Sequence, residues 1–498
     1  MELFFTRVSR LERTPGTPRG EHDLEFTAEQ ARGLGLRDGI PFILDSGGSY
    51  DIHLNRFLRD EAARGGLSPH TGRAYAYDIL TWARYLAERR GPLSSNGQAL
   101  GKTIWEADQS DIVAYHQERR VGSYSTGGGT VEISTWDRAV SALDRLYTWA
   151  KKEAIITKVP FTYSDEKGNH GSGDPWNSGS SNTALEAGAR HNRVRWLSLP
   201  QYIFFREVGL RGRLPDGAED PKSRVRTGAR NAAFADLLVA TGMRVREGGS
   251  LLDREVAAPG DTILLSEQRS VAMNLAPARC KGRKGRTVYA GLDLLVQVDN
   301  YRRVERALAL EQRRKHDHEP VARRLLRVTC PRGGSFRLDD GTVLPFARMT
   351  DSDVFRSIEC PEATTSSTPV QLFLTESGSP FPVEAWYDVF RKASDRCRTF
   401  GMDLHVTPHV LRHTFAIHYL THKVRSLIGT IDSAEYRNDS ARQAYLRILT
   451  DPLRQLQRRL GHAWIESTYH YLDHVADAQE LIDDAFHRWR GVDEEESV

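Results

Sequence analysis

Basic and phenolic side chains gather at short spacings near the C-terminal end of the chain. His409 and Arg412 stand three positions apart, and His462 stands nine positions before Tyr471. Residues three apart share one face of a helix, so His409 and Arg412 are expected to point the same way. This pair offers donors that suit phosphate oxygens, and the arginine fork can bind two of them at once. The stretch therefore indicates chemistry on a phosphate group.

Tyr471 is the candidate nucleophile for that chemistry. A tyrosine hydroxyl titrates near pH ~10, so it attacks poorly unless neighbouring charge and hydrogen bonds activate it. Two arginines and two histidines around one phosphate would supply that activation and would stabilise the charge that builds on phosphorus. The second arginine has to come from elsewhere in the chain.

Local signals place these side chains on helices. Thr407 and Pro408 indicate a helix start, because threonine is a good N-cap and proline is tolerated in the first turn. Gly461 is typical of a helix C-terminal cap. Thr468 can begin a short helix that returns Tyr471 toward His462, so the two side chains are expected to meet.

Two earlier segments carry further candidates. A helical run over 231–239 leads into Arg244, and Glu247 follows three positions later, where it can orient a neighbouring side chain. Two glycines come next and cost roughly 1 kcal/mol each in a helix, so this helix is expected to end early. Further on, the basic run 279–286 separates the strand-like stretches 271–275 and 287–289, which predicts a hairpin with a basic tip.

Taken in order, these motifs resemble those of tyrosine recombinases, also called phage-type integrases. That family combines an arginine in Thr-Gly-x-Arg-x-x-Glu, a hairpin lysine, His-x-x-Arg, Leu-Gly-His and a nucleophilic tyrosine, and each has a counterpart here. The resemblance implies the catalytic residues Arg244, Lys281, His409, Arg412, His462 and Tyr471, with Glu247 in a supporting position. Arg246, Tyr469 and His470 fall outside the family's register.

The resemblance also implies roles for these residues. Arg244 and Arg412 would clamp the phosphate, His462 would donate to it, and His409 would donate or shuttle a proton. The hairpin lysine would protonate the departing 5′ oxygen as a general acid.

The identity of the hairpin lysine rests on register. Register selects Lys281, with Cys280 where a glycine is usual, and Lys284 is the rival. The alternative is that the basic residues of this hairpin only contact the DNA backbone. Arg73, Lys284 and Arg286 are the candidate DNA-binding residues, although charges on helices usually lie on a solvated face.

The fold class that follows is mainly α with a small antiparallel β-sheet, in which a helical core-binding domain joins a tyrosine-recombinase catalytic domain. Glycine, serine and asparagine are frequent over 161–193, which is typical of a flexible linker. The predicted parts are an N-terminal extension at 1–44, a helical DNA-binding domain at 45–160, a linker at 161–193, and a catalytic domain at 194–498 with insertions near 325–372 and 425–455.

Composition sets outer limits on these interpretations. The chain has 498 residues, 27% of them charged, and a net charge of +3, which is too mild to establish nucleic-acid binding by itself. Four widely spaced cysteines predict free thiols in a reducing cytosol. No signal peptide or membrane span is predicted, so we expect a cytoplasmic protein with no membrane partner. No cofactor such as ATP is expected, because the bond energy would be kept in the phosphotyrosyl ester. No metal site is expected either, because no carboxylate cluster suited to two metal ions is evident in the sequence.

The function implied is site-specific DNA recombination or integration through a 3′-phosphotyrosyl intermediate, on double-stranded DNA with paired half-sites. The resemblance adds a homo-oligomer, a tetramer on DNA, or an assembly with related recombinases. Two alternatives stay open: a type IB topoisomerase-like enzyme that relaxes DNA, and a non-catalytic DNA-binding accessory protein.

Overall fold

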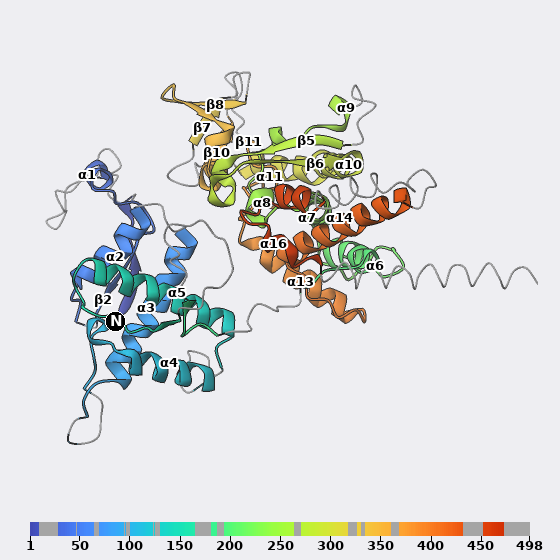
Figure 1. Cartoon of the computed structure of the whole chain (residues 1–498). Helices are drawn as coiled ribbons and strands as arrows, with labels where there is room; N and C mark the ends of the chain where they lie inside the picture. The colour runs from blue at the N-terminus through green and yellow to red at the C-terminus, as the bar shows by residue number, and fades with distance from the viewer. Residues whose placement is uncertain are drawn as a thin grey trace, which may run out of the picture. The chain divides into compact units, whose positions relative to one another are not determined.

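The computed structural model divides the chain into two compact units, Met1–Asn192 and Arg193–Val498 (Figure 1). Helices dominate both units, and the described strands form four separate sheets. The described residues are 1–8, 28–45, 47–63, 69–93, 95, 100–122, 124, 130–164, 181–186, 194–262, 270–316, 326–329, 334–359, 368–431 and 452–472. Within these ranges every helix is too short or too polar for a bilayer crossing.

The first unit is a helical bundle. Its helices are α1 (Ala28–Gly33), α2 (Ile52–Ala63), α3 (Pro69–Arg89), η2 (Ile104–Glu106), α4 (Gln109–Val121) and α5 (Ile133–Lys152). Apolar residues at helical spacing on α3 and α5 meet in one core, where the Trp82 indole donates to the Tyr147 hydroxyl over 2.7 Å. Aromatic packing therefore holds this core, and the Trp82–Tyr147 hydrogen bond satisfies one of its buried polar pairs.

The described ends of the predicted N-terminal extension are part of this unit. Strands β1 (Glu2–Phe5) and β2 (Pro41–Leu44) pair in antiparallel fashion. The buried Asn55 side chain accepts from the Ile43 amide over 2.7 Å and donates to the Ile43 carbonyl over 2.8 Å, which fixes β2 against α2. Residues 9–27 of the predicted extension lie outside the described residues.

The described ends of the predicted linker also pack on the first unit. Strand β3 (Tyr163–Ser164) pairs with β4 (Ser181–Asn182), and the Trp136 indole of α5 donates to the Ala184 carbonyl over 2.8 Å. Residues 165–180 and 187–193 lie outside the described part of the chain.

The second unit is built around α7 (Gly228–Thr241), most of whose residues are buried. Phe234 of α7 stacks on Trp386 of α13 with ring centroids 3.6 Å apart. The other helices of this unit are α6 (Leu199–Phe204), η3 (Phe205–Leu210), α8 (Val245–Gly249), η4 (Asp253–Glu255), α9 (Pro259–Thr262), α10 (Leu292–Tyr301), η8 (Arg302–Arg306), α11 (Ala307–His316), α13 (Ala385–Thr399), α14 (Pro408–Ile431), the helix at 452–460, and α16 (Glu466–Tyr469).

The predicted hairpin is confirmed. Strands β5 (Ser270–Leu275) and β6 (Arg286–Gly291) pair in antiparallel fashion, and two short 3₁₀ turns, η6 (Pro277–Arg279) and η7 (Lys281–Arg283), carry the basic residues between them.

The predicted insertion near 325–372 has a small core of its own. It adds a five-stranded sheet in the order β11-β10-β7-β8-β9, in which β10 and β7 run parallel and the other neighbours antiparallel. Its elements are β7 (Leu326–Thr329), β8 (Ser335–Leu338), β9 (Val343–Pro345), η9 (Phe346–Arg348), α12 (Asp351–Arg356), β10 (Ser357–Glu359) and β11 (Thr368–Pro369). Of the second predicted insertion, 432–451 lies outside the described residues, and α14 continues through its start.

Candidate active site

Arg244 is positioned by a tight turn between α7 and α8. Gly242 follows α7 with φ +66°, and a Cβ there would lie 2.4 Å from the Phe415 ring of α14. Glycine is needed because it allows both this left-handed backbone and the close approach of α14. Arg244 then becomes the N-cap residue of α8, which ends after five residues as its two glycines predicted.

Arg412 ties three segments of the site together. Its side chain on α14 is buried, and its guanidinium donates to the carbonyls of Gly242 over 2.5 Å and Leu460 over 2.6 Å. Burial, with the nearby charge of Arg244, lowers the pKa of Arg412 to about 9, so it stays a cation at neutral pH. The turn before Arg244 and the helix end before His462 are thus held by one arginine.

Glu247 lies beneath the site as a buried carboxylate. The Arg286 guanidinium donates to its two oxygens over 2.7 and 2.6 Å, and Arg244 donates to it over 2.8 Å from the backbone and 3.1 Å from the side chain. Burial raises the pKa of Glu247, but the hydrogen bonds and charge of Arg286, with those of Arg244, outweigh burial and hold the pKa below its ordinary value. Glu247 is therefore ionised and fixes Arg244.

Arg286, one of the predicted DNA-binding residues, is engaged within the protein. Its side chain is only 7% exposed, and its Nε donates to the Arg459 carbonyl over 2.7 Å while both terminal nitrogens bind Glu247. With these groups engaged, Arg286 is a positioning residue that joins the hairpin to the floor of the site. Its register in β6, opposite Leu275, aims it inward.

His409 lies on the open face of α14. The pKa of His409 is lowered, first because the surrounding residues shield its ring from water. The positive charges of Arg412, Arg244 and Lys281 lower it further. Its ring lies 4.4 Å from that of His413, one helical turn further on. At neutral pH His409 is therefore mostly a neutral imidazole among cations.

His462 follows the helix at 452–460 across Gly461, which has φ +65°. Its Nδ1 lies 3.0 Å from the buried Thr468 hydroxyl, so Nε2 is the ring nitrogen left to face a ligand. Burial, with the charges of Arg412, Arg244 and Arg286, lowers the pKa of His462 to about 3. It is consequently neutral over the physiological range and can donate through one nitrogen only.

Tyr471 is 3% exposed and packs against Phe415, Leu456 and Leu460. Its ring is stacked on that of His462 at 6.3 Å with an interplanar angle of 14°. Burial raises the pKa of its hydroxyl, while Arg412 and Arg244 both act to lower it. Both arginines are therefore close enough for their charge to act on the hydroxyl.

His413 contacts Tyr471, although the sequence motifs gave His413 no role in the site. Its Nδ1 lies 2.9 Å from the Tyr471 hydroxyl. The available signal was its position four residues after His409 on the same helix, which places both rings on one face. His413 holds the phenol in the described arrangement.

Lys281 and Lys284 are both exposed at the tip of the hairpin. Lys281 lies within electrostatic range of His409, whose pKa its charge lowers. The neighbouring Cys280 is buried, and burial raises the pKa of its thiol, so it is a structural residue. The charge of Lys281 therefore acts on His409, whereas Lys284 is not among the charges that lower the pKa of this histidine.

The remaining DNA-binding candidate, Arg73, belongs to the first unit. It is exposed on α3, and its guanidinium lies over the rings of Phe5 at 5.0 Å and Tyr77 at 5.9 Å. This stacking orients the side chain and leaves it open to solvent.

The charges around the site favour an anionic ligand. Four cations, Arg244, Lys281, Arg286 and Arg412, act on its histidines, whereas Glu247 is the carboxylate hydrogen-bonded among them. Within the described residues no group of His, Cys, Asp or Glu side chains is arranged to hold a metal ion. The arrangement can therefore bind a phosphate through side-chain cations, with the buried Tyr471 phenol beside this site.

Two family models match the chain. The N-terminal SAM-like domain of phage integrases matches residues 54–154, and the phage integrase family model matches residues 219–428, together more than half of the chain. The chain belongs to the tyrosine recombinase family. These matches fall on the bundle of the first unit and on the unit that holds Arg244 and Arg412.

The individual relatives of this tyrosine recombinase share less than a third of their aligned residues with it. It is 28% identical over 122 residues to "Tyrosine recombinase XerD" of Corynebacterium glutamicum, a match that spans 23% of this chain and 37% of the relative. A structure of the XerH recombinase bound to palindromic difH substrate matches with 15% identity and a TM-score of 0.44, over 89% of this chain and 86% of that one. The Tn1549 transposon integrase with circular intermediate DNA matches with 14% identity and a TM-score of 0.40, over 85% of this chain and 97% of that one.

Proposed function

We propose that this tyrosine recombinase cuts and rejoins DNA strands through a covalent link between Tyr471 and a 3′ phosphate. The observation that carries the proposal is the pair of Arg412 hydrogen bonds to Gly242 and Leu460, which draws together segments far apart in the sequence. Family membership supports double-stranded DNA as the substrate.

The scissile phosphate would be bound by Arg244 and Arg412. Arg412 uses one nitrogen on each of two neutral carbonyls, so its charge is not cancelled by a direct carboxylate partner within the described residues. Arg244 is held from behind by Glu247 and stays 24% exposed toward the site. A phosphodiester bound here would gain charge-assisted hydrogen bonds from preorganised donors.

The chemical step then exchanges one phosphate ester bond for another. The Tyr471 oxygen forms a bond to phosphorus as the bond to the 5′ oxygen breaks, and the phenolic proton leaves through the histidines near it. Lys281 supplies the proton that the 5′ oxygen takes up. In the second step a 5′ hydroxyl attacks the phosphotyrosine, and the phenol regains a proton. No external energy source is needed.

The two histidines differ in what they can contribute. With a pKa of about 3, His462 enters the reaction neutral and acts as a hydrogen-bond donor to a phosphate oxygen. The pKa of His409 is also lowered, but its ring is exposed, which suits a group that accepts a proton and passes it on. A neutral His409 can take the phenolic proton as attack begins.

Tyr471 has to leave its described position before it can attack. Its hydroxyl is bound to His413 and its ring is buried. DNA binding would therefore have to exchange the hydrogen bond from His413 for one to the phosphate.

Covalent trapping on nicked duplexes, taken from the DNA that flanks the gene, tests the nucleophile. Tyr471→Phe should abolish the protein–DNA adduct, because the attacking oxygen is removed. Tyr469→Phe is the matched control, since Tyr469 is a phenol two positions away that is 48% exposed, and it should keep the adduct. Loss of the adduct in Tyr469→Phe with retention in Tyr471→Phe would refute the assignment.

The recombination role adds paired half-sites and an assembly of several subunits on DNA, with strand exchange serving integration. Measured masses of the complex on duplexes with one half-site and with two test this part. Two half-sites should recruit more than one subunit, and a complex of a single subunit on both duplexes would contradict it. Relaxation of a plasmid lacking paired half-sites would favour the topoisomerase-like alternative.

A further inference from the structure

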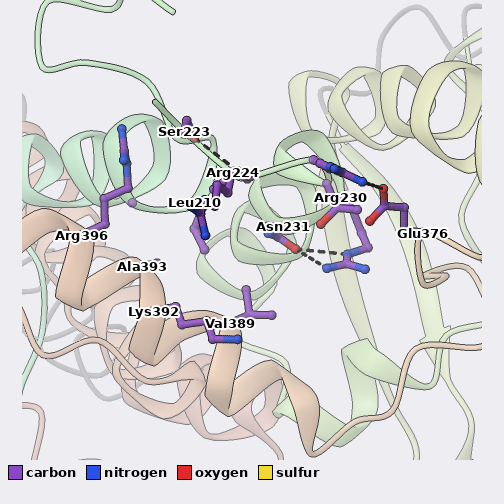
Figure 2. Close-up of a pocket in the computed structure, with 14 residues that line it drawn as sticks. Leu210, Ser223, Arg224, Arg230, Asn231, Glu376, Val389, Lys392, Ala393 and Arg396 are labelled. Carbon is purple, nitrogen blue, oxygen red and sulfur yellow. Dashed lines mark hydrogen bonds and ion pairs between the residues drawn. The ribbon is translucent and has the colours of Figure 1, made fainter. Parts of the chain in front are cut away.

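A pocket of about 770 Å³ opens at the N-terminal end of α7 (Figure 2). The 14 residues of α7 separate it from Gly242, which corresponds to roughly 20 Å of helix. Its walls come from the end of η3, the loop 223–227, the first turn of α7 and one face of α13. The basic residues that line it are Arg224, Arg226, Arg230, Lys392 and Arg396.

Three of these cations already have acidic partners. Arg396 pairs with Asp220 at 2.7 Å. Lys392 pairs with Asp388 at 2.8 Å. Arg226 pairs with Glu376 at 3.2 Å, with both side chains more than half exposed. Arg224 and Arg230 are the two basic residues of the pocket lining that these pairs do not include.

Arg230 is a buried cation without a carboxylate at ion-pair distance among the described residues. It is 5% exposed, and its guanidinium donates to Asn231 Oδ1 over 3.1 and 2.8 Å and to the Leu374 carbonyl over 3.0 Å. Figure 2 draws the two bonds to Asn231 as dashed lines. Burial lowers the pKa of Arg230 to about 10, so it remains charged at neutral pH. Its guanidinium also lies 4.0 Å from the centre of the Phe381 ring, which stabilises the charge without neutralising it. A buried cation whose contacts are all neutral favours an anion nearby.

Asn231 supplies a second, independent indication. Its side chain is 7% exposed, lines the pocket, and has its oxygen occupied by Arg230. The amide nitrogen of Asn231 therefore faces away from Arg230, and it has no acceptor among the described residues. This nitrogen is not among the fully buried polar atoms that lack a partner, so it is reached by solvent in the pocket and can donate to a ligand there.

The other free groups of the pocket are also donors. Arg224 is exposed and has neither a hydrogen bond nor an ion pair to another described residue. The Thr227 side chain makes no capping hydrogen bond. Two unpaired guanidinium charges match the charge of about −1.5 to −2 that a phosphate monoester carries at neutral pH. The volume lies in the range, about 300–1,000 Å³, of small-molecule sites.

We propose that this pocket binds a small molecule through a dianionic phosphate group, held by Arg224, Arg230 and the Asn231 amide. Isothermal titration of the 498-residue chain with inorganic phosphate, at constant ionic strength, should give saturable binding at one site. Arg224→Ala should weaken that binding about tenfold, the value of one charge-assisted hydrogen bond. The variant should keep its fold because Arg224 is exposed.

Asn231→Asp is the sharper variant. It is nearly isosteric and gives Arg230 a carboxylate partner, so it preserves the fold while it cancels one charge and removes the amide donor. Phosphate binding should be lost. Arg398→Ala is the control, because Arg398 also lies on α13 but pairs with Asp395 and Asp403 and does not line the pocket. It should bind phosphate as the unaltered chain does.

Two further arms identify the source of the phosphate. Adenosine 5′-monophosphate should bind and adenosine should not, because the phosphate group is what the pocket recognises. The proposal is overturned if inorganic phosphate does not bind, or if Arg224→Ala and Asn231→Asp bind it as tightly as Arg398→Ala. It is also overturned if phosphate fails to bind while Arg224→Ala weakens binding of duplex DNA, since the pocket would then be a DNA contact.

Discussion

Arg286 and Glu247 face each other across the floor of the active site, with both carboxylate oxygens bound by one guanidinium at 2.7 and 2.6 Å. The two residues are 39 positions apart. Their pairing means that the hairpin and the helix of Arg244 cannot shift independently, because either movement would separate a buried ion pair.

Removing the guanidinium should therefore destabilise the chain. Arg286→Ala leaves Glu247 buried without its main partner, and we expect a loss of about 3–5 kcal/mol in the free energy of unfolding. Arg286→Lys should lose less, because one charge remains but the forked geometry does not. Urea unfolding followed by circular dichroism measures both. Equal stability of Arg286→Ala and the unaltered chain would show that the pair contributes nothing.

The lowered pKa of His462 predicts how the stability of the folded chain depends on pH. The pKa of His462 is about 3 in the folded chain, below the ordinary value of roughly 6.5 in an unfolded one. Between these values the unfolded state binds more protons, so stability should fall as pH drops below about 6.5 and should level off near pH 3. His462→Asn should flatten this part of the profile of urea midpoint against pH. An unchanged slope in the variant would exclude His462 as the titrating group.

His413 should control the exposure of the nucleophile. In His413→Ala the 2.9 Å contact to the Tyr471 hydroxyl is lost, and we expect faster acetylation of that hydroxyl, measured by mass spectrometry of the peptide. Tyr469 is exposed in the unaltered chain and serves as the internal reference, with the same rate in both proteins. Unchanged acetylation of Tyr471 would mean that packing alone holds the phenol.

The roles of Lys281 and Lys284 can be distinguished by changing the leaving group of the cleavage reaction. Lys281→Ala should slow cleavage of an ordinary duplex by about 10²–10⁴-fold, the usual contribution of a general acid. The same variant should cleave a duplex with a 5′-bridging sulfur at the unaltered rate, because a thiolate leaves without a proton. Lys284→Ala should behave normally on both duplexes. If Lys284→Ala were instead slow on the ordinary duplex and normal on the sulfur-containing one, Lys284 would be the general acid.

Gly242 should not tolerate a side chain. Gly242→Ala places a Cβ 2.4 Å from the Phe415 ring at a backbone φ of +66°, and a cost of about 1–3 kcal/mol is expected from overpacking alone. Combining it with Phe415→Leu should recover part of this loss, since the backbone strain remains. If Gly242→Ala melts at the same temperature as the unaltered chain, the close approach of α14 is not a constraint.

The sequence by itself was enough to indicate the family and to place several candidate side chains on local elements. His409, Arg412, Gly461 and the hairpin with Lys281 could be placed because each depends on spacing within one or two turns of chain, where helix and turn geometry are fixed by local rules. The motif order was enough to indicate the family, and the early end of α8 followed from its glycines.

Tertiary structure decided which basic residues are available to a ligand. Arg286, which the sequence makes a candidate DNA contact, is hydrogen-bonded to Glu247 and to the Arg459 carbonyl. The bond between His413 and Tyr471 joins residues 58 positions apart. The pocket at Arg230 is closed by a helix that starts over 150 residues later. Such pairings depend on how helices pack across the core, and the packing of distant side chains leaves no periodic trace in the local sequence.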